Sequence, residues 1–309
     1  MLTYVVRRLF FAIFVLWGAL TIIFIVIRSI PGNPAEVLLG PSATPDEVAA
    51  LSNRLGLQQP LPLQYALFLQ HVVHGDFGTS SQFGVPAFAL VLQRVPASAE
   101  LAAVAMSIVL VAGFTLGPLL ASIADTKLDR FATSVVFFTQ ALPDFWIAIL
   151  LLMMFSGRLG LLPAEGKSDW HSFVLPAITL AFPFSCVLIR FVRSGILDVQ
   201  RSGYIQTARA KGLSPWVIFR RHSLRNMLIP VLTIVGVQLG MLFSGAAIVE
   251  TVYNWPGVGQ LFLNAITYRD YSVVQVDVFL FACVFVGINF TVDILYAYID
   301  PRIRLGRES

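Results

Sequence analysis

A run of small and cationic residues between 204 and 230 is the part of this chain whose residue types point most directly to a chemical task. Small side chains let a helix backbone approach another protein closely, and clustered cations attract acidic residues or lipid phosphates. The task indicated is docking, not bond making or breaking. The residues involved are Tyr204, Gln206, Thr207, Ala208, Arg209, Ala210, Lys211, Gly212, Ser214, Pro215, Arg220, Arg221, Arg225 and Pro230.

The spacing within this run predicts two short helices that meet at a sharp corner. Gly212 is the residue type expected where a helix ends in left-handed geometry. Ser214 and Pro215 then form the N-cap and first position of a second helix, and Pro230 marks the start of the next apolar segment. A loop whose cations only hold lipid headgroups is the alternative. The capped corner favours docking, because a lipid-facing loop needs no such turn.

Composition places the run in a membrane protein. The chain has 309 residues, of which 57% are hydrophobic and 12% charged, with a mean hydropathy of +0.79, whereas soluble domains carry about 25% charged residues. A membrane-spanning helix needs about 20 mostly apolar residues. The six runs that qualify are about 9–30, 98–123, 132–156, 173–190, 227–249 and 276–298.

The distribution of cations predicts the orientation of these spans. Fifteen of the 21 Lys and Arg residues fall in the segments that lie inside if the N-terminus is inside, and six fall outside. Because cytoplasmic loops are enriched in Lys and Arg, both termini are predicted to be cytoplasmic. Residues 31–97 then form an outer segment and residues 191–226 an inner loop. The same bias explains the net charge of +4 without nucleic-acid binding.

The outer segment carries its own helix signals. Thr44, Pro45 and Glu47 predict a helix start with an N-cap, a proline at the first position and acids in the first turn. This helix is expected to stop at Gly56. A second short helix is expected over 63–74, ended by two glycines at 75 and 78. A lid on the outer membrane face and an inert spacer both fit this pattern. Another short helix, around 261–263, is expected in the last outer loop.

Two polar side chains within the third apolar run could line a solute path. Asp144 follows a proline near the middle of the run, and Gln140 precedes it. A carboxylate at the centre of a bilayer costs about 2.5–3.5 kcal/mol on insertion scales, so its presence needs a reason. Asp144 either meets a cationic group of the solute or makes a hydrogen bond at a helix kink, and both readings stay open.

Catalytic and metal-binding patterns are missing from the sequence. The chain has no Gly-x-x-x-x-Gly-Lys-Ser/Thr run that could cradle a nucleotide phosphate, and no nucleophile–base–acid set. Its four histidines are scattered, and Cys186 and Cys283 lie in apolar runs, where free buried thiols are expected. We therefore predict a protein that is not an enzyme and that binds neither a metal nor a cofactor.

Residues 207–212, Thr-Ala-Arg-Ala-Lys-Gly, resemble the coupling loop of ABC-importer permeases. In the general signature, Glu-Ala-Ala precedes Gly by three residues; here Gln206 replaces the acid, and the closing Ile-Pro at 229–230 comes several residues late. These departures look like the dipeptide, oligopeptide, glutathione and nickel branch. Other segments resemble the first permease subunit of that branch, namely 4–8, 31–34, 55–61, 75–78, 224–230, 254–259, 269–271 and 300–304.

The resemblance implies an all-α, type I importer domain of six helices that spans residues 1–309 in a bacterial inner membrane. It implies a second homologous permease, two cytoplasmic ATPases that bind the ATP and dock at the inner loop, and a periplasmic solute-binding protein. Di- or oligopeptides are the favoured solutes, with glutathione and nickel as alternatives. An ion-coupled secondary transporter would instead show inverted repeats and several midplane carboxylates.

Overall fold

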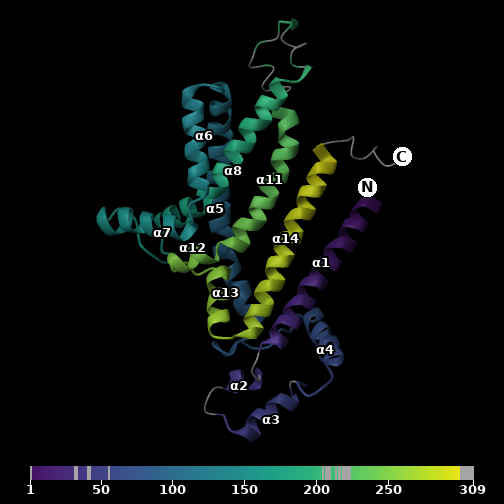
Figure 1. Cartoon of the computed structure of the whole chain (residues 1–309). Helices are drawn as coiled ribbons and strands as arrows, with labels where there is room; N and C mark the ends of the chain where they lie inside the picture. Colours follow the sequence, from purple (N-terminus) through teal and green to yellow (C-terminus); the bar gives the residue numbers. More distant parts are fainter. Residues whose placement is uncertain are drawn as a thin grey trace. The chain divides into compact units, whose positions relative to one another are not determined.

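The protein is built from α-helices joined by turns. Its computed structural model describes residues 2–30, 34–39, 43–54, 56–203, 205, 210–212, 214, 217 and 224–299 (Figure 1). In that part of the chain, β-structure amounts to an isolated bridge between Thr79 and Pro86. The described residues form two compact units: unit 1 is Ser98–Pro256 with Gly287–Ser309, and unit 2 is Leu2–Ala97 with Gly257–Val286.

Five described helices are long and apolar enough to cross a membrane. They are Val6–Ser29, Ala87–Ser122, Trp170–Gln200, Pro230–Val252 and Tyr271–Leu295. A sixth crossing results when the bent pair Lys127–Gln140 and Asp144–Arg158 counts as one span. The all-α, multi-spanning fold predicted from the sequence is therefore confirmed, and the sixth span is a broken one.

The third apolar run, predicted as one span over 132–156 with a possible kink at its proline, is broken into two helices. Helix α6 (Lys127–Gln140) ends before Ala141, and α7 (Asp144–Leu151) leaves at 99° and continues as the π-helical turn η1 (Leu152–Arg158). Pro143 lies in an extended conformation (φ −66°, ψ 138°), and a proline disfavours helical geometry in the residue before it. Asp144 is thus the first residue of α7, where the helix dipole favours a carboxylate.

Unit 2 begins with α1 (Leu2–Ser29) and continues through α2 (Pro34–Leu39), α3 (Pro45–Arg54) and α4 (Leu61–Val73). The predicted start of α3 is confirmed. The Thr44 backbone N–H donates to Glu47 Oε2 over 2.8 Å, and the Glu47 N–H donates to Thr44 Oγ1 over 3.4 Å. The hydrogen bonds that the Glu47 carboxylate accepts from the Thr44 N–H and from Thr44 Oγ1 hold the pKa of this carboxyl below its ordinary value. Gly56, with φ +64°, closes the helix as expected.

The core of unit 2 joins segments that are far apart in the sequence. Apolar side chains of α1, of the start of α5 (Ala87–Ser122), of α13 (Val258–Thr267) and of the start of α14 (Tyr271–Ile299) pack in one cluster. Within the cluster Val91, Val258 and Val273 are fully buried. The short helix predicted around 261–263 is present as α13, and its apolar side chains are buried in this cluster.

Buried hydrogen bonds also tie the turn before α5 to the loop before α14. The Asp270 carboxylate, 1% exposed, accepts a 2.5 Å hydrogen bond from Ser80 Oγ and a 3.3 Å hydrogen bond from the Gln82 N–H. Gly75 (φ +74°) and Gly78 (φ +83°) end α4 and begin the turn, as their sequence positions predicted. The outer segment is therefore folded onto its neighbours within unit 2.

Unit 1 is organised around α8 (Val174–Gln200), which follows the 3-10 turn η2 (Trp170–Phe173). Helix α8 packs against α6, α7, α11 (Leu224–Gly245) and α12 (Ala247–Val252); Figure 1 shows α6, α8 and α11 running alongside one another. Cys186 is buried in α8 and Cys283 is half-buried in α14, and both are free thiols.

The helices on either side extend into the predicted inner loop, residues 191–226. Helix α8 continues to Gln200, so residues 191–200 are helical, and α11 begins at Leu224. Pro230 therefore lies inside α11, and it marks the start of the apolar span Pro230–Val252, as predicted. Because proline has no backbone N–H, α11 lacks the hydrogen bond that would run from this position to the carbonyl four residues earlier.

Two glycines of α5 allow a close approach to α8. A Cβ added to Gly117 would lie 2.6 Å from Val192 Cγ1 and 2.8 Å from Val192 Cβ, and one added to Gly113 would lie 2.5 Å from Leu188 Cδ2. Such contacts between small residues and a facing side chain are typical of helix pairs in membranes, where close packing replaces the hydrophobic effect.

We predict that Gly117→Ala destabilises the protein by about 1–3 kcal/mol, the usual cost of overpacking. The methyl group meets the β-branched Val192, which has little freedom to move away. The thermal unfolding midpoint in detergent measures the effect. Gly287→Ala is the matched control, because a Cβ at Gly287 in α14 meets nothing within 4 Å. Equal midpoints for the two variants would contradict the close contact.

Candidate coupling site

The segment that follows α8 is anchored by one buried side chain. The Arg201 N–H donates to the Leu197 carbonyl and the Ser202 N–H to the Val199 carbonyl, which closes the last turn of the helix. The Ile205 N–H then donates to the Ser202 carbonyl, and the Ile205 side chain is fully buried against Val199. The direction in which the chain leaves α8 is therefore set by local hydrogen bonds and one apolar contact.

The corner predicted at Gly212 has the expected geometry. Gly212 adopts φ +77° and is exposed, and so are its neighbours Ala210 and Lys211. Ser214 Oγ accepts a 3.5 Å hydrogen bond from the Val217 N–H, as the predicted N-cap should. A Cβ added to Gly212 meets nothing within 4 Å, so glycine is required here by its backbone conformation and not by crowding inside the chain.

Several predicted site residues lie outside the described part of the chain. They are Tyr204, Gln206, Thr207, Ala208, Arg209, Pro215, Arg220 and Arg221. The backbone of Arg225 belongs to the first turn of α11, and its side chain lies outside the description. The structure therefore tests the turn at the corner and leaves the cations of the second short helix as predictions.

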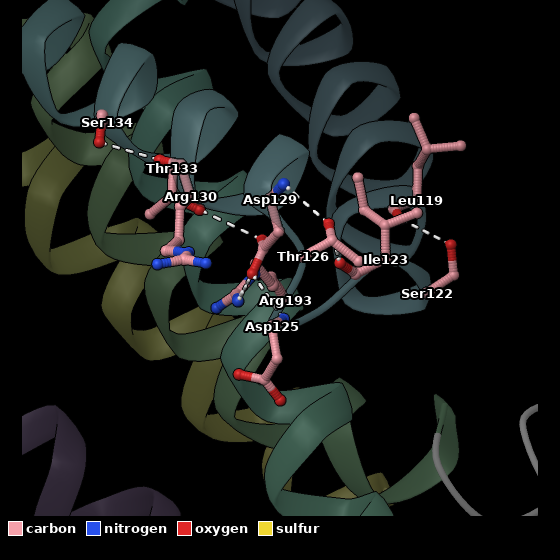
Figure 2. Close-up of polar contacts among 10 residues, drawn as sticks. All are labelled: Leu119, Ser122, Ile123, Asp125, Thr126, Asp129, Arg130, Thr133, Ser134 and Arg193. Atoms are coloured by element: carbon pink, nitrogen blue, oxygen red, sulfur yellow. Dashed lines mark hydrogen bonds and ion pairs between the residues drawn. The ribbon is translucent and has the colours of Figure 1, made fainter.

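A buried ion pair braces the end of α8 from which this segment emerges. Arg193 donates from Nε to Asp129 Oδ1 over 2.9 Å and from Nη2 to Asp129 Oδ2 over 2.6 Å (Figure 2). The Asp129 side chain is 4% exposed and that of Arg193 is 20% exposed. Paired hydrogen bonds between a guanidinium and a carboxylate fix orientation as well as distance, so this contact sets both the spacing and the rotation of α6 and α8.

The Asp129 carboxylate is also the centre of the turn between α5 and α6. It accepts hydrogen bonds from the Asp125 N–H (3.1 Å) and from Thr133 Oγ1 (3.3 Å). Thr126 caps α6 by accepting the Asp129 N–H over 3.1 Å, and Figure 2 shows these side chains gathered around Asp129. The Asp129 carboxylate therefore has partners at both oxygens, which offsets the cost of burying its charge.

A second contact of the same helix pair lies one turn away. The Arg190 guanidinium of α8 stands 4.9 Å from the centroid of the Phe137 ring of α6, a distance at which a cation and an aromatic face attract. Together with the glycine contacts of α5, it makes the inner half of α8 a fixed part of unit 1. A displacement of the exposed corner would therefore be transmitted to α5 and α6.

Sequence reasoning missed this brace. The sequence analysis did not single out Asp129, and it counted Arg193 only among the inner cations. The available signal was Thr126 three residues before Asp129, a helix-start pattern in which the acid is held near the first turn. Nothing local indicates that the partner of this acid lies 64 residues further on.

The two candidate path residues flank the break between α6 and α7. Gln140 is exposed at the end of α6, and Asp144 is half-buried at the start of α7. The break separates them by three residues, and the hydrogen bonds of the described chain include none between their side chains. The kink hydrogen bond considered for Asp144 is not among them, so the path role stays a prediction.

The fold resembles that of a chain of a solved ABC transporter. The inward-facing MetNI methionine ABC transporter has a chain that superposes with a TM-score of 0.57 at 22% identity, covering 68% of this chain and 96% of the other. A second crystal form of MetNI gives 0.56 at 19% identity. At such identities the likeness shows the architecture alone.

Sequence comparison shows the family. Residues 113–305 match the model of binding-protein-dependent transport system inner membrane components, and residues 1–102 match that of their N-terminal part. The dipeptide permease protein DppB of Alkalihalophilus pseudofirmus is 37% identical over 98% of this chain and 100% of its own. The glutathione permease protein GsiC of Salmonella typhimurium is 38% identical, and that of Escherichia coli K12 is 36% identical, each over 98% of this chain and 99% of its own.

The chain therefore belongs to the family of binding-protein-dependent transport system inner membrane components, in its dipeptide and glutathione group. It is a multi-pass permease subunit of an ABC importer in the inner membrane. A subunit of this family is not an enzyme and holds no cofactor, since separate ATPase subunits bind the ATP. Among the described residues no group of three His, Cys, Asp or Glu side chains could hold a metal ion.

We predict that Asp129→Asn destabilises the protein by about 3 kcal/mol, within the range measured when one partner of a buried ion pair is removed. The Arg193 guanidinium then faces an uncharged amide that cannot accept both of its hydrogen bonds. Chemical or thermal unfolding of the purified chain gives the value.

The control for this change is Asp125→Asn in the same turn. It removes one negative charge from an exposed side chain whose φ of +67° suits asparagine, and it is expected to change stability by less than about 0.5 kcal/mol. If both variants lose the same stability, the effect is one of net charge and the brace is unimportant.

Proposed function

We propose that this chain is the permease subunit of an importer for short peptides. The relatives carry the proposal: one is named for dipeptide transport and others for glutathione transport, and glutathione is itself a small peptide derivative. Short peptides are thus the solute class common to both names. Glutathione is the second candidate within that class, because the GsiC proteins match this chain as well as DppB does.

We propose further that the permease works as one half of a pair, with a homologous second permease, two cytoplasmic ATPases and a periplasmic binding protein. The exposed corner at Gly212 is the feature that supports ATPase docking. Gly212 has a left-handed φ and is exposed, a Cβ added to it would meet nothing within 4 Å, and Ser214 Oγ accepts a hydrogen bond from the Val217 N–H. Neighbouring cations at 209, 211, 220, 221 and 225 supply the positive charge for acidic residues of the ATPase.

A movement of this surface is transmitted to the rest of unit 1 through the contacts of α8. A push on the corner acts through Ile205 on the end of α8, and from there through Arg193 on Asp129 and the α5–α6 turn. A nucleotide can shift a conformational equilibrium only if the ATPase contacts differ in free energy between the two states. The corner is the place where such a difference would enter this subunit.

Reconstitution tests the function as a whole. Liposomes that contain this chain, the second permease and both ATPases are expected to take up a labelled dipeptide delivered by the binding protein only when ATP is supplied. The same liposomes driven by a proton or sodium gradient should take up none. Uptake from the gradient alone, without ATPases, would establish the secondary transporter instead.

Gly212→Ala and Gly203→Ala form a matched pair that tests docking. Added methyl groups meet nothing within 4 Å at either position, but only Gly212 has a left-handed φ, where alanine costs about 1 kcal/mol or more. We expect Gly212→Ala to lower ATPase recovery in a pull-down by about fivefold or more, since 1 kcal/mol corresponds to about that factor. Gly203→Ala should leave recovery unchanged; equal recovery for both would remove the corner from the docking surface.

The path role of Asp144 is tested by Asp144→Asn. If the carboxylate meets the ammonium group of a peptide, peptide uptake should fall about tenfold or more, as expected for losing a charge-assisted hydrogen bond. ATPase recovery and the amount of protein in the membrane should not change. Gln140→Ala, on the other side of the break, reports on the second path residue. Normal uptake by the Asp144 variant would assign the carboxylate to the helix start alone.

A further inference from the structure

Unit 2 contains a cavity of about 310 Å³ that is lined by none of the candidate coupling or path residues. It lies among the last turn of α1, helix α4, the turn after α4 and the start of α14, all within the same compact unit. Its volume is at the lower end of the range for small-molecule sites. The side chains that matter for its chemistry are Arg28, Arg269, Gln64, Asp76, Phe24 and Phe77.

Two guanidiniums and two carboxylates line the cavity. The Arg28 guanidinium stands over the Phe24 ring, 5.6 Å from its centroid, and Arg269 is exposed in the turn before α14. Neither guanidinium has an ion pair with another described residue. Of the two carboxylates, Asp270 already accepts hydrogen bonds from Ser80 and from backbone N–H groups, and Asp76 accepts one from the Gly78 N–H. The two guanidiniums can therefore bind an anionic group of a ligand, such as a phosphate.

Gln64 adds an acceptor that needs a donor. Its side-chain Nε2 donates to the Leu57 carbonyl over 3.0 Å and to the Gln59 carbonyl over 2.7 Å, which fixes the orientation of the amide. The residue is 9% exposed and lines the cavity, and its Oε1 has no hydrogen-bond partner in the described chain. A buried acceptor without a partner costs free energy that a ligand donor would recover.

The position of the cavity relative to the membrane indicates which molecule supplies the anion. Arg28 stands at the end of the span Val6–Ser29, and Tyr271 begins the span Tyr271–Leu295. The cavity thus lies where two spans of unit 2 meet the membrane surface, which is the level of phospholipid headgroups. Its aromatic walls, Phe24, Phe68 and Phe77, suit the apolar part of a lipid.

We propose that this cavity binds the headgroup of a membrane phospholipid. Arg28 and Arg269 hold the phosphate, and Gln64 Oε1 accepts a hydrogen bond from the hydroxyl of phosphatidylglycerol or the ammonium of phosphatidylethanolamine. The glycerol and the first part of the acyl chains lie against the aromatic walls. Phosphatidylcholine carries no N–H or O–H donor in its headgroup, so it should bind less tightly.

Native mass spectrometry of the delipidated, full-length protein tests this site. Titrated phosphatidylglycerol should bind the unchanged chain more tightly than phosphatidylcholine does. The double variant Arg28→Gln with Arg269→Gln should bind phosphatidylglycerol more weakly, by about fivefold for each arginine and hence roughly 25-fold for the pair. If the double variant folds poorly, the single variant Arg269→Gln replaces it, because it changes only an exposed turn residue. Its affinity for phosphatidylglycerol should be about fivefold lower than that of the unchanged chain.

Three results would overturn the assignment. The first is that Arg158→Gln, which removes an exposed arginine outside the cavity, weakens binding as much as Arg269→Gln. The second is that diacylglycerol, which lacks the phosphate, binds as tightly as phosphatidylglycerol. The third is displacement of the lipid by equimolar inorganic phosphate, which would make the cavity a site for a free anion.

Discussion

The buried pair of Asp129 and Arg193 is the interaction on which the mechanics of unit 1 depend. Burying either charge without its partner would be costly. Their paired hydrogen bonds also fix the spacing of α6 and α8 and the rotation of one helix against the other. The same carboxylate organises the turn between α5 and α6 through Asp125 and Thr133. Three helices are thereby held in register by a single acid on the predicted inner side of the membrane.

This arrangement suits a subunit that must move as a body. Under the proposed function, force enters at the exposed corner around Gly212 and reaches α8 through the segment anchored by Ile205. A flexible connection there would absorb the displacement before it reached the solute path. The ion pair, the contact of Arg190 with Phe137 and the glycine packing of α5 all lie on the α8 side of that connection, where rigidity is needed.

Local signals in the sequence predicted local structure well. The runs of apolar residues gave the spans, Thr44 and Glu47 gave the start of α3, and Gly212 with Ser214 gave the corner, because each depends on residues a few positions apart. The third apolar run was predicted less completely. A helix kink was expected beside Pro143, but the chain turns there by 99° between α6 and α7.

Long-range contacts could not be predicted from one sequence. Three features bring together residues from separate helices or loops: the ion pair of Asp129 with Arg193, the hydrogen bond from Ser80 to Asp270 and the cavity around Gln64. Charge counting assigned Arg193 to the inner side and stopped there. Family resemblance was informative at the level of the whole chain, since it depends on the order of many weak motifs and not on any one contact.

The approach of α5 to α8 has an evolutionary consequence. A Cβ at Gly117 would overlap Val192, so a larger side chain at position 117 has to be matched by a smaller one at position 192. Among related permeases the two sites should therefore vary as a compensated pair, with alanine or serine at the first accompanied by alanine or glycine at the second. An alignment deep enough to detect such exchange would recover the helix pairing without any coordinates.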